Sequence, residues 1–429
     1  MQIIKNQTID QMAKQIRQET AATDDAIVAA QVADIIKNVR ENGDEALKTY
    51  SATFDGVTPA TWRVSETEIQ AAMASVPQKV LAALRTAAEN IRTFHQQEVA
   101  VGFEDTPREG IVRGVKVTPL SAVGIYVPGG TAAYPSSVLM NAIPAKIAGV
   151  PNIVMVTPPQ KDGLNPTVLA AAKIAGVDQI FQVGGAQAIA ALAYGTATIP
   201  AVDKITGPGN RYVAMAKKMV YGQVAIDMIA GPSEIGILAD DSARAADIAA
   251  DLLSQAEHDV NARVLLMTTS ATLATAVNAA VAQQLETLPR ADIARAAIND
   301  HGVIYLVNTI DEMFTLMNLV GPEHLEVQLT NPAQYLAKIQ NAGSIFLGPY
   351  ASEPLGDYFS GPNHILPTGG TARFSSPLGV WDFQKRLQYL QYTQSALAED
   401  LPAVTQLARA EGLEAHARAV QTRFNSNVG

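Results

Sequence analysis

From residue 112 onward, short apolar segments alternate with alanine-rich segments, and this alternation constrains the fold more than any other feature of the chain. The apolar segments predict strands at residues 121–127, 152–156, 179–183, 234–239, 263–268, 303–307 and 344–347. The segments between them predict helices, for example at 242–256 and 273–285. Strands that alternate with helices form βαβ units, and such units build a parallel sheet.

An internal repeat supports this interpretation. Residues 145–150 and 172–177 both read AKIAGV, and each copy is followed by a predicted strand with isoleucine at the same offset. A helix that ends at a glycine and leads into a strand is one unit of a doubly wound fold. Chance in an alanine-rich chain is the alternative, but the matching flanks favour the structural explanation.

The 429 residues are too many for one core, and the predicted strands form two groups that meet near residue 233. We therefore expect an α/β fold with two Rossmann-like parallel-sheet domains and helical segments at both termini. Helices are predicted at 27–50 and 66–95 by apolar residues at three-to-four spacing. The expected boundaries are an N-terminal helical segment (1–22), a discontinuous first α/β domain (23–125 and 234–378), a second α/β domain (126–233) and a helical C-terminal segment (379–429), whose last long helix spans 403–424.

Composition excludes several classes of function. The net charge of −10 argues against nucleic acid, whose affinity for proteins comes largely from lysine and arginine. No run of 18 apolar residues is present, and the first twenty residues are too polar for a signal peptide, so we expect a cytoplasmic protein without membrane contact. Cysteine is absent, which removes disulfides, thiolate metal ligands and a cysteine nucleophile.

The standard dinucleotide fingerprint is missing. Gly184 and Gly185 follow a predicted strand, but they lack the GxGxxG spacing. Gly207 and Gly209 have the first two glycines of that motif, while Tyr212 stands where the third should be. The motif alone therefore does not predict NAD.

A glycine- and proline-rich segment at 348–374 carries Asp357, Asn363 and His364, and long irregular segments of this kind usually shape a site, although a wide surface loop is the alternative. Gln255 and His258 are three residues apart at the end of a predicted helix, so they share one face. Such a pair is able to bind a metal, whereas a histidine at a helix end is more often a partner of the helix dipole.

Two further acid–imidazole pairs stand out. Glu323 and His324 lie between a predicted helix and a strand, where they offer two proton-transfer groups, or else a simple exposed pair. Glu411 and His416 are five residues apart, roughly 140° around a continuous helix, so they share one site only if the helix bends near Gly412.

Taken together, the motifs of this chain resemble those of the histidinol dehydrogenase family, from about residue 30 to 424. The segments that carry the resemblance are GIYVPGGTAAYPSSVLMNAIPAKIAGV (124–150), GGAQAIAALAYGT (184–196), KITGPGN (204–210), IDMIAGPSE (226–234), LLSQAEHD (252–259), GPEHLE (321–326), AGSIFLGPY (342–350), GDYFSGPNHILPT (356–368) and AEGLEAH (410–416). One small departure is Arg263, where glutamine is expected.

The resemblance implies a site for each cofactor and for the substrate. One Zn²⁺ per subunit would be bound by Gln255, His258, Asp357 and His416. Proton transfer would fall to Glu323 and His324. NAD would contact Tyr126, Gln187 and Asn210. The substrate would contact Ser233, Gln255, His258, Glu323, His324, Asp357, Glu411 and His416. Glu411 and His416 would be supplied by the partner subunit of a homodimer with shared active sites.

The implied reaction is the four-electron oxidation of L-histidinol to L-histidine through an aldehyde, with two NAD, as the last step of histidine biosynthesis. Because no thiol is present, water rather than a thiolate would add to the aldehyde. Two rival hypotheses remain at this stage: a zinc hydrolase that uses the same acid–base pair on an amide or ester, and a non-catalytic sugar- or nucleotide-binding α/β protein.

Overall fold

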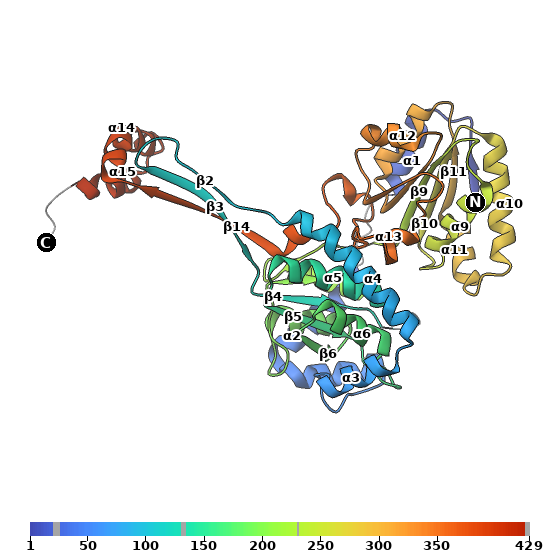
Figure 1. The fold of residues 1–429 in the computed structure, drawn as a ribbon, viewed down its shortest axis with the longest axis horizontal. Coiled ribbons are helices and arrows are strands. Elements are labelled where there is room, and N and C mark those ends of the chain that lie inside the picture. Colours follow the sequence, from blue (N-terminus) through green and yellow to red (C-terminus); the bar gives the residue numbers. More distant parts are fainter. Residues whose placement is uncertain (20–25, 130–133, 230, 425–429) are drawn as a thin grey trace. The chain divides into compact units, whose positions relative to one another are not determined.

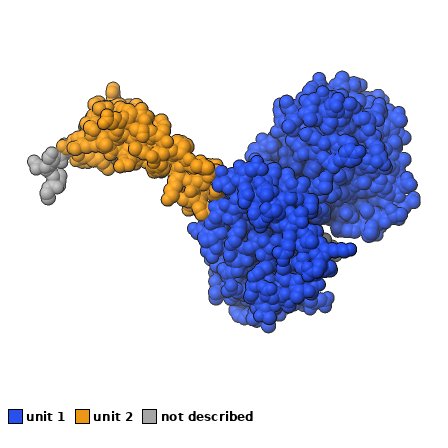
Figure 2. Space-filling view, viewed as in Figure 1, with its two compact units in different colours: residues 1–99, 120–383 blue, residues 100–119, 384–429 orange. Residues whose placement is uncertain are grey.

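The structure, a computed structural model, describes residues 1–19, 26–129, 134–229 and 231–424 (Figure 1). The chain divides into two compact units. The first comprises residues 1–99 and 120–383, and the second comprises residues 100–119 and 384–429 (Figure 2). The first unit contains two parallel sheets and the second a three-stranded antiparallel sheet. The predicted α/β fold with two parallel-sheet domains is therefore confirmed.

One parallel sheet has six strands in the order β1-β11-β10-β9-β12-β13. Their bounds are β1 Gln2–Ile4, β11 Gly302–Leu306, β10 Arg263–Thr268, β9 Glu234–Ala239, β12 His324–Gln328 and β13 Ser344–Leu347. The central strands are buried on both faces because helices cover the sheet from both sides, as is usual for parallel sheets (Figure 1). Alternate residues point to opposite faces, so Ile237 packs in one apolar cluster and Leu238 in the other.

The helices of this domain divide between the two faces. One face is covered by α9 Ala245–Ala256, α10 Ala271–Leu285 and α11 Ala291–His301. The other is covered by α1 Ile9–Glu19 and α12 Ile310–Val320. In the register of the sheet, His324 at the start of β12 pairs with Ile235 of β9 and with Ser344 of β13. The first residues of β9 and β12 therefore lie side by side at the amino edge of the sheet.

The second parallel sheet has five strands in the order β6-β5-β4-β7-β8. Their bounds are β6 Gln179–Gln182, β5 Asn152–Thr157, β4 Ala122–Tyr126, β7 Lys204–Thr206 and β8 Ala225–Ile226. The strand order reverses at β4, because the next strands along the chain, β5 and β6, lie on one side of it and β7 and β8 on the other. Ligands of open α/β sheets commonly bind at the carboxyl ends of the strands beside such a reversal.

Helices also cover both faces of the five-stranded sheet. One face packs on α3 Glu66–Ser75, α4 Gln78–His95, α5 Pro135–Ala148 and α6 Pro166–Ala175, and the other on α2 Ala26–Tyr50, α7 Gly185–Tyr194 and α8 Arg211–Val220. The repeated AKIAGV motif ends α5 and α6, and Gly149 and Gly176 take the left-handed conformation, with φ of 91° and 80°. β5 and β6 follow, as the repeat predicts.

In its described residues, 100–119 and 384–424, the second unit consists of a sheet and two α-helices. Its strands are β2 Phe103–Asp105, β3 Ile111–Pro119 and β14 Gln384–Tyr392, paired antiparallel in the order β14-β3-β2. Its helices are α14 Gln394–Ala410 and α15 Glu414–Gln421. Gly412 has a φ of +76° and interrupts the helical run, so the bend that the sequence requires near this residue is present.

Several elements differ from the sequence-based expectations. The N-terminal segment is not wholly helical, because β1 adds an edge strand beside β11. The C-terminal segment is not wholly helical either, since β14 pairs with β3 along nine residues. The expected helix at 66–95 is two helices, which Pro77 separates because it caps the second one. The glycine-rich segment at 348–374 contains the short helix α13 Pro354–Tyr358.

The expected domain boundaries remain a prediction about folding units, and the packing groups some residues in another way. α2, α3 and α4 pack on the five-stranded sheet, whereas β1 and α1 belong to the six-stranded sheet. Short 3₁₀ and π-helical elements complete the described chain: η1 Ser51–Asp55, η2 Gln96–Glu98, η3 Pro332–Lys338, η4 Thr371–Arg373, η5 Val380–Phe383 and η6 Thr422–Phe424. Among the described residues, no helix has the length and apolar character needed to cross a membrane.

Candidate functional site

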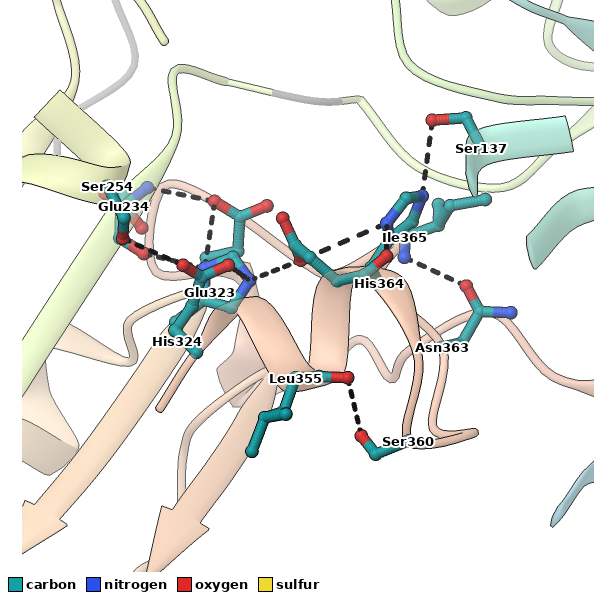
Figure 3. A network of polar contacts seen from close by, with 12 residues as sticks. Ser137, Glu234, Ser254, Glu323, His324, Leu355, Ser360, Asn363, His364 and Ile365 are labelled. Atoms are coloured by element: carbon teal, nitrogen blue, oxygen red, sulfur yellow. Dashed lines mark hydrogen bonds and ion pairs between the residues drawn. The ribbon is translucent and has the colours of Figure 1, made fainter. Parts of the chain in front are cut away.

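A buried acid–base cluster lies at the amino edge of the six-stranded sheet, where α12 leads into β12. Glu323 precedes the strand, and its Oε2 accepts a hydrogen bond from the backbone N–H of Glu234 at 2.9 Å. His324 is 3% exposed, and its Nδ1 lies 3.1 Å from the carbonyl oxygen of Glu234 (Figure 3). Nδ1–H therefore donates to that carbonyl, which leaves Nε2 to face the cluster.

Two carboxylates from the segment after β13 approach His324. Asp357 of α13 places Oδ1 3.4 Å from Nε2 of His324, and Glu353 places Oε1 3.7 Å from the same nitrogen. Nε2 of His324 and Oε1 of Glu353 are buried without a hydrogen-bond partner. Buried polar atoms rarely remain unpaired, so this gap marks a place where a ligand or ion fits.

The electrostatics of the cluster follow from burial and close charges. Burial alone lowers the pKa of His324, but the charges of Glu323, Asp357 and Glu353 outweigh it and raise the pKa to about 10. Burial raises the pKa of Glu323 to about 8, against the opposing effect of His324. For Asp357, burial is outweighed by the close approach of the His324 imidazole and by the charge of His364, and the pKa of the carboxyl is held well below its usual range.

His364 connects the loop after α13 to α5. Its Nδ1–H donates to the carbonyl oxygen of Asp357 at 2.9 Å, and its Nε2 lies 3.2 Å from Oγ of Ser137, as Figure 3 shows. Burial lowers the pKa of His364. The neighbouring Asn363 donates from Nδ2 to the carbonyl oxygen of Met140 at 2.8 Å. The bond from His364 therefore fixes the carbonyl group of Asp357, and the other two contacts hold the loop against α5.

Gln255 and His258 extend the cluster from the end of α9. Gln255 is 1% exposed, and its amide nitrogen is buried without a good hydrogen-bond partner, although the amide is close enough to Glu353 to affect the pKa of that carboxyl. Burial lowers the pKa of His258, and Asp357 is the strongest opposing charge. The structure thus brings Gln255, His258 and Asp357 into one region.

The donor set suits a divalent cation. It comprises the imidazole of His258, whose pKa burial lowers, the carboxylate of Asp357, whose pKa is also lowered, and the buried amide of Gln255, whose nitrogen lacks a partner. Nitrogen and oxygen donors of this kind suit Zn²⁺. A second combination also has metal-like geometry: His324, Glu353 and Asp357 each offer a ligand atom, and these atoms lie within 4.8 Å of one another. Asp357 belongs to both sets.

Glu353, Glu326 and Asp251 form a group of acids that was not predicted from the sequence. Glu353 is 1% exposed, accepts a hydrogen bond from Oγ of Ser254 and donates its own backbone N–H to Glu326 at 2.9 Å. Burial raises the pKa of Glu326 to about 8, with Asp251 as the next cause. The signal was present in the sequence, since Glu326 lies in the middle of a strand and charged residues are rarely buried without a role.

Three expected substrate residues remain, and Ser233 is the one that adjoins this cluster, because it precedes Glu234, whose backbone bonds to Glu323 and His324. Ser233 directly precedes β9 and is half-buried. Glu411 caps the end of α14, and His416 lies in α15, so both belong to the second unit. Their assignment to a site shared between subunits stays a prediction.

The residues expected to contact NAD line one cavity of about 1050 Å³ at the carboxyl ends of β4 and β7. Tyr126 ends β4, Gln187 lies in the first turn of α7, and Asn210 precedes α8. The Tyr126 hydroxyl accepts the backbone N–H of Gly185 at 3.1 Å, and burial raises its pKa to about 12. Gln187 is 1% exposed, and its Oε1 is buried without a partner. These features favour a polar ligand of nucleotide size.

The fold and these two sites define an α/β enzyme with a nucleotide-sized cavity and a buried acid–base cluster. The family model of histidinol dehydrogenase matches residues 18–424. The chain therefore belongs to the histidinol dehydrogenase family, which makes it an oxidoreductase.

Similar proteins agree along the whole chain. The histidinol dehydrogenase of Lactiplantibacillus plantarum is 61% identical over 426 residues, which are 99% of each chain. That of Listeria innocua is 56% identical over 417 residues, or 97% of this chain and 98% of the relative. The crystal structure of histidinol dehydrogenase from Elizabethkingia anophelis has a TM-score of 0.94 at 38% identity, and covers 99% of this chain and 98% of that one.

Proposed function

We propose that this chain oxidises L-histidinol to L-histidine through L-histidinaldehyde, with zinc and two NAD, as the last step of histidine biosynthesis. The observation that carries the proposal is the buried cluster of Glu323, His324 and Asp357, which offers a proton acceptor and a separate acid beside donors for a cation. Membership of the histidinol dehydrogenase family supports the same reaction.

Gln255, His258 and Asp357 would bind the zinc ion together with the partner subunit's His416. When bound, zinc would supply a Lewis acid for holding and orienting the substrate. Cation binding also has a consequence within the cluster. Once Asp357 is a ligand, its carboxylate holds the His324 proton less strongly, and the pKa of His324 falls from about 10 toward the range in which imidazole acts as a base.

In the first half-reaction, His324 accepts the proton of the substrate hydroxyl. Its Nδ1–H is already committed to the carbonyl oxygen of Glu234, so Nε2 is the nitrogen that takes the proton. Burial of the ring excludes competing water.

In the second half-reaction, Glu323 takes a proton from the water that adds to the aldehyde. Burial raises the pKa of Glu323 to about 8, so the carboxylate form that acts as a base becomes populated as the pH rises through that value. The hydrogen bond from the backbone of Glu234 fixes one carboxylate oxygen and leaves the other to contact water. The second oxidation should therefore accelerate between about pH 7 and 9.

Tyr126, Gln187 and Asn210 would bind NAD, which accepts a hydride in each half-reaction. The buried, unpaired Oε1 of Gln187 and the Tyr126 hydroxyl, which keeps its proton at neutral pH, offer an acceptor and a donor to a nucleotide. Expected substrate contacts are Ser233, Gln255, His258, Glu323, His324, Asp357, and Glu411 and His416 of the partner subunit.

A homodimer fits the character of the second unit. Among its described residues, the buried apolar side chains are Ile111, Ala396 and Ala417, which is a small core for an independent unit. Meanwhile Leu390 is 66% exposed and Leu407 is 68% exposed. Apolar surface of this kind commonly packs against another chain, and a second copy would cover it.

The reaction is tested by counting NADH. The protein is incubated with zinc, excess NAD⁺ and a limiting amount of L-histidinol at mildly alkaline pH, and absorbance is followed to completion. The proposal predicts two NADH per histidinol. One NADH would mean that the aldehyde step fails, and none from zinc-loaded protein would favour a hydrolase or a binding protein.

A further inference from the structure

The loop that carries Asn210 is held at Gly207 by a buried lysine and a buried aspartate. Gly207 directly follows β7, and its backbone N–H donates to Oδ2 of Asp227 at 2.8 Å. Its carbonyl oxygen accepts a hydrogen bond from Nζ of Lys217 in α8 at 2.9 Å. Lys217 and Asp227 also form an ion pair with each other. Both polar groups of this one glycine are therefore bound by a single charged pair.

The pair is almost completely removed from water. The side chain of Lys217 is 3% exposed and that of Asp227 is 1% exposed. Asp227 is further fixed by the backbone N–H of Met228, which donates to its Oδ1 at 2.6 Å. Buried ion pairs commonly stabilise a fold no better than apolar residues of the same size. Stability alone therefore does not explain this pair, and its role depends on the backbone that it holds in place.

The ion pair of Lys217 and Asp227 holds a crowded turn at Gly207. Gly207 has a φ of +109°, and a Cβ at this position would lie 2.1 Å from the backbone oxygen of Tyr126. The loop thus passes directly over the end of β4, beside the point where the strand order reverses. Only glycine fits there, and glycine is the residue with the most conformational freedom to lose. The turn therefore needs contacts from outside the loop to keep Gly207 in one conformation.

The Lys217–Asp227 pair affects the position of Asn210, which lines the nucleotide-sized cavity. Asn210 lies three residues after Gly207, and its Oδ1 accepts the backbone N–H groups of Tyr212 and Val213 at 3.0 and 3.2 Å. This cap uses the oxygen of the amide, so Nδ2 is the atom of Asn210 that is able to donate to a ligand in the cavity. The position of Nδ2 follows from the path of residues 207–210.

We propose that Lys217 and Asp227 are positioning residues for the cofactor: they hold the loop at 207–210 over β4 so that Asn210 meets NAD. This inference rests on the proposed function, because it takes NAD as the occupant of the cavity. Neither residue lines the cavity itself, so each acts through Gly207 and not by contact with the ligand.

The test compares single and double substitutions. Lys217→Met or Asp227→Leu alone leaves one buried charge without a partner and destabilises the protein. The double variant Lys217→Met/Asp227→Leu removes both charges, and its melting temperature should return toward that of the wild type. NAD binding should not return with it, because Gly207 remains without its two partners.

The readouts are the dissociation constant of NAD from isothermal calorimetry, the KM values for NAD and histidinol, and the zinc content. In the double variant we expect the dissociation constant and the KM for NAD to rise about tenfold, as for the loss of one well-placed hydrogen bond. Zinc content and the KM for histidinol should stay within about twofold of the wild type. Lys218→Met, at the exposed neighbouring position on α8, serves as the matched control and should bind NAD normally.

A double variant that recovers both its stability and its NAD affinity would overturn the inference, since the pair would then be only structural. If the double variant does not fold, Asp227→Ala decides: it removes the acceptor of the Gly207 N–H, and unchanged NAD affinity in the folded variant overturns the inference equally. Failure of the proposed function is distinct, because the wild-type protein itself would then neither bind NAD nor form NADH.

Discussion

Tyr126→Phe should weaken both the five-stranded domain and the binding of NAD, for one structural reason. The Tyr126 side chain is 3% exposed, and its hydroxyl accepts the backbone N–H of Gly185, which opens α7. Phenylalanine keeps the ring but leaves this N–H without a partner. A buried donor left unpaired costs about 1–3 kcal/mol. For a domain of roughly 150–250 residues, each kcal/mol lowers the melting temperature by about 2–4 °C.

The same hydroxyl is the donor that Tyr126 presents to the cavity, because burial raises its pKa to about 12 and it stays protonated. We therefore expect the dissociation constant of NAD to rise about tenfold in Tyr126→Phe. Calorimetry with NAD and thermal unfolding by circular dichroism measure the two effects. Tyr212→Phe is the control, because Tyr212 lines the same cavity and is half-buried. If Tyr126→Phe matched this control in both measurements, the role of the hydroxyl would be refuted.

Three further predictions concern single side chains. His258→Asn should reduce bound zinc to well below one ion per subunit, as measured by atomic absorption, and an unchanged zinc content would exclude His258 as a ligand. Glu323→Gln should slow oxidation of histidinaldehyde more than oxidation of histidinol in single-turnover assays, because only the former needs added water; equal slowing would contradict this division of roles. Burial raises the pKa of Asp55 to about 6, above its value in the unfolded chain, so the wild type should lose stability relative to Asp55→Asn as pH rises from about 4 to 6, and keep that deficit above pH 6. Because Asp55 is half exposed, we expect about 1 kcal/mol, and a difference that is independent of pH in denaturant titrations would argue against the shift.

Much of the fold could be predicted because the strands of parallel sheets are continuous apolar runs. β9 and β10 are buried along nearly their whole length, and a short, mainly apolar segment between two predicted helices is typical of such a strand. β14 was missed for the opposite reason. Eight of its nine residues are exposed in this chain, so it shows neither a buried run nor a clear alternation. β14 pairs with β3, which lies far away in the sequence, and no local sequence pattern predicts such a pairing.

The sequence predicted which site residues lie close together when they belong to one element. It did not predict contacts between residues of different elements. Gln255 and His258 are three residues apart at the end of a predicted helix, so their proximity could be inferred. In the structure α9 ends at Ala256, and His258 lies in the turn that follows, where its backbone N–H donates to the carbonyl oxygen of Gln255. The approach of Asp357 to His324 depends on how the segment after β13 folds back to β12, which only the tertiary structure determines. Glu353 was missed because an acid in a loop usually faces water, whereas here it is 1% exposed.

The most direct test of this account is a crystal structure of the zinc-loaded protein with histidinol, with the ion located by anomalous scattering at the zinc edge. We predict one peak per subunit, in contact with Gln255, His258, Asp357 and the partner subunit's His416. A peak bound instead by His324, Glu353 and Asp357, whose ligand atoms also lie within 4.8 Å of one another, would contradict the account, because His324 would then be a ligand and unable to act as the base.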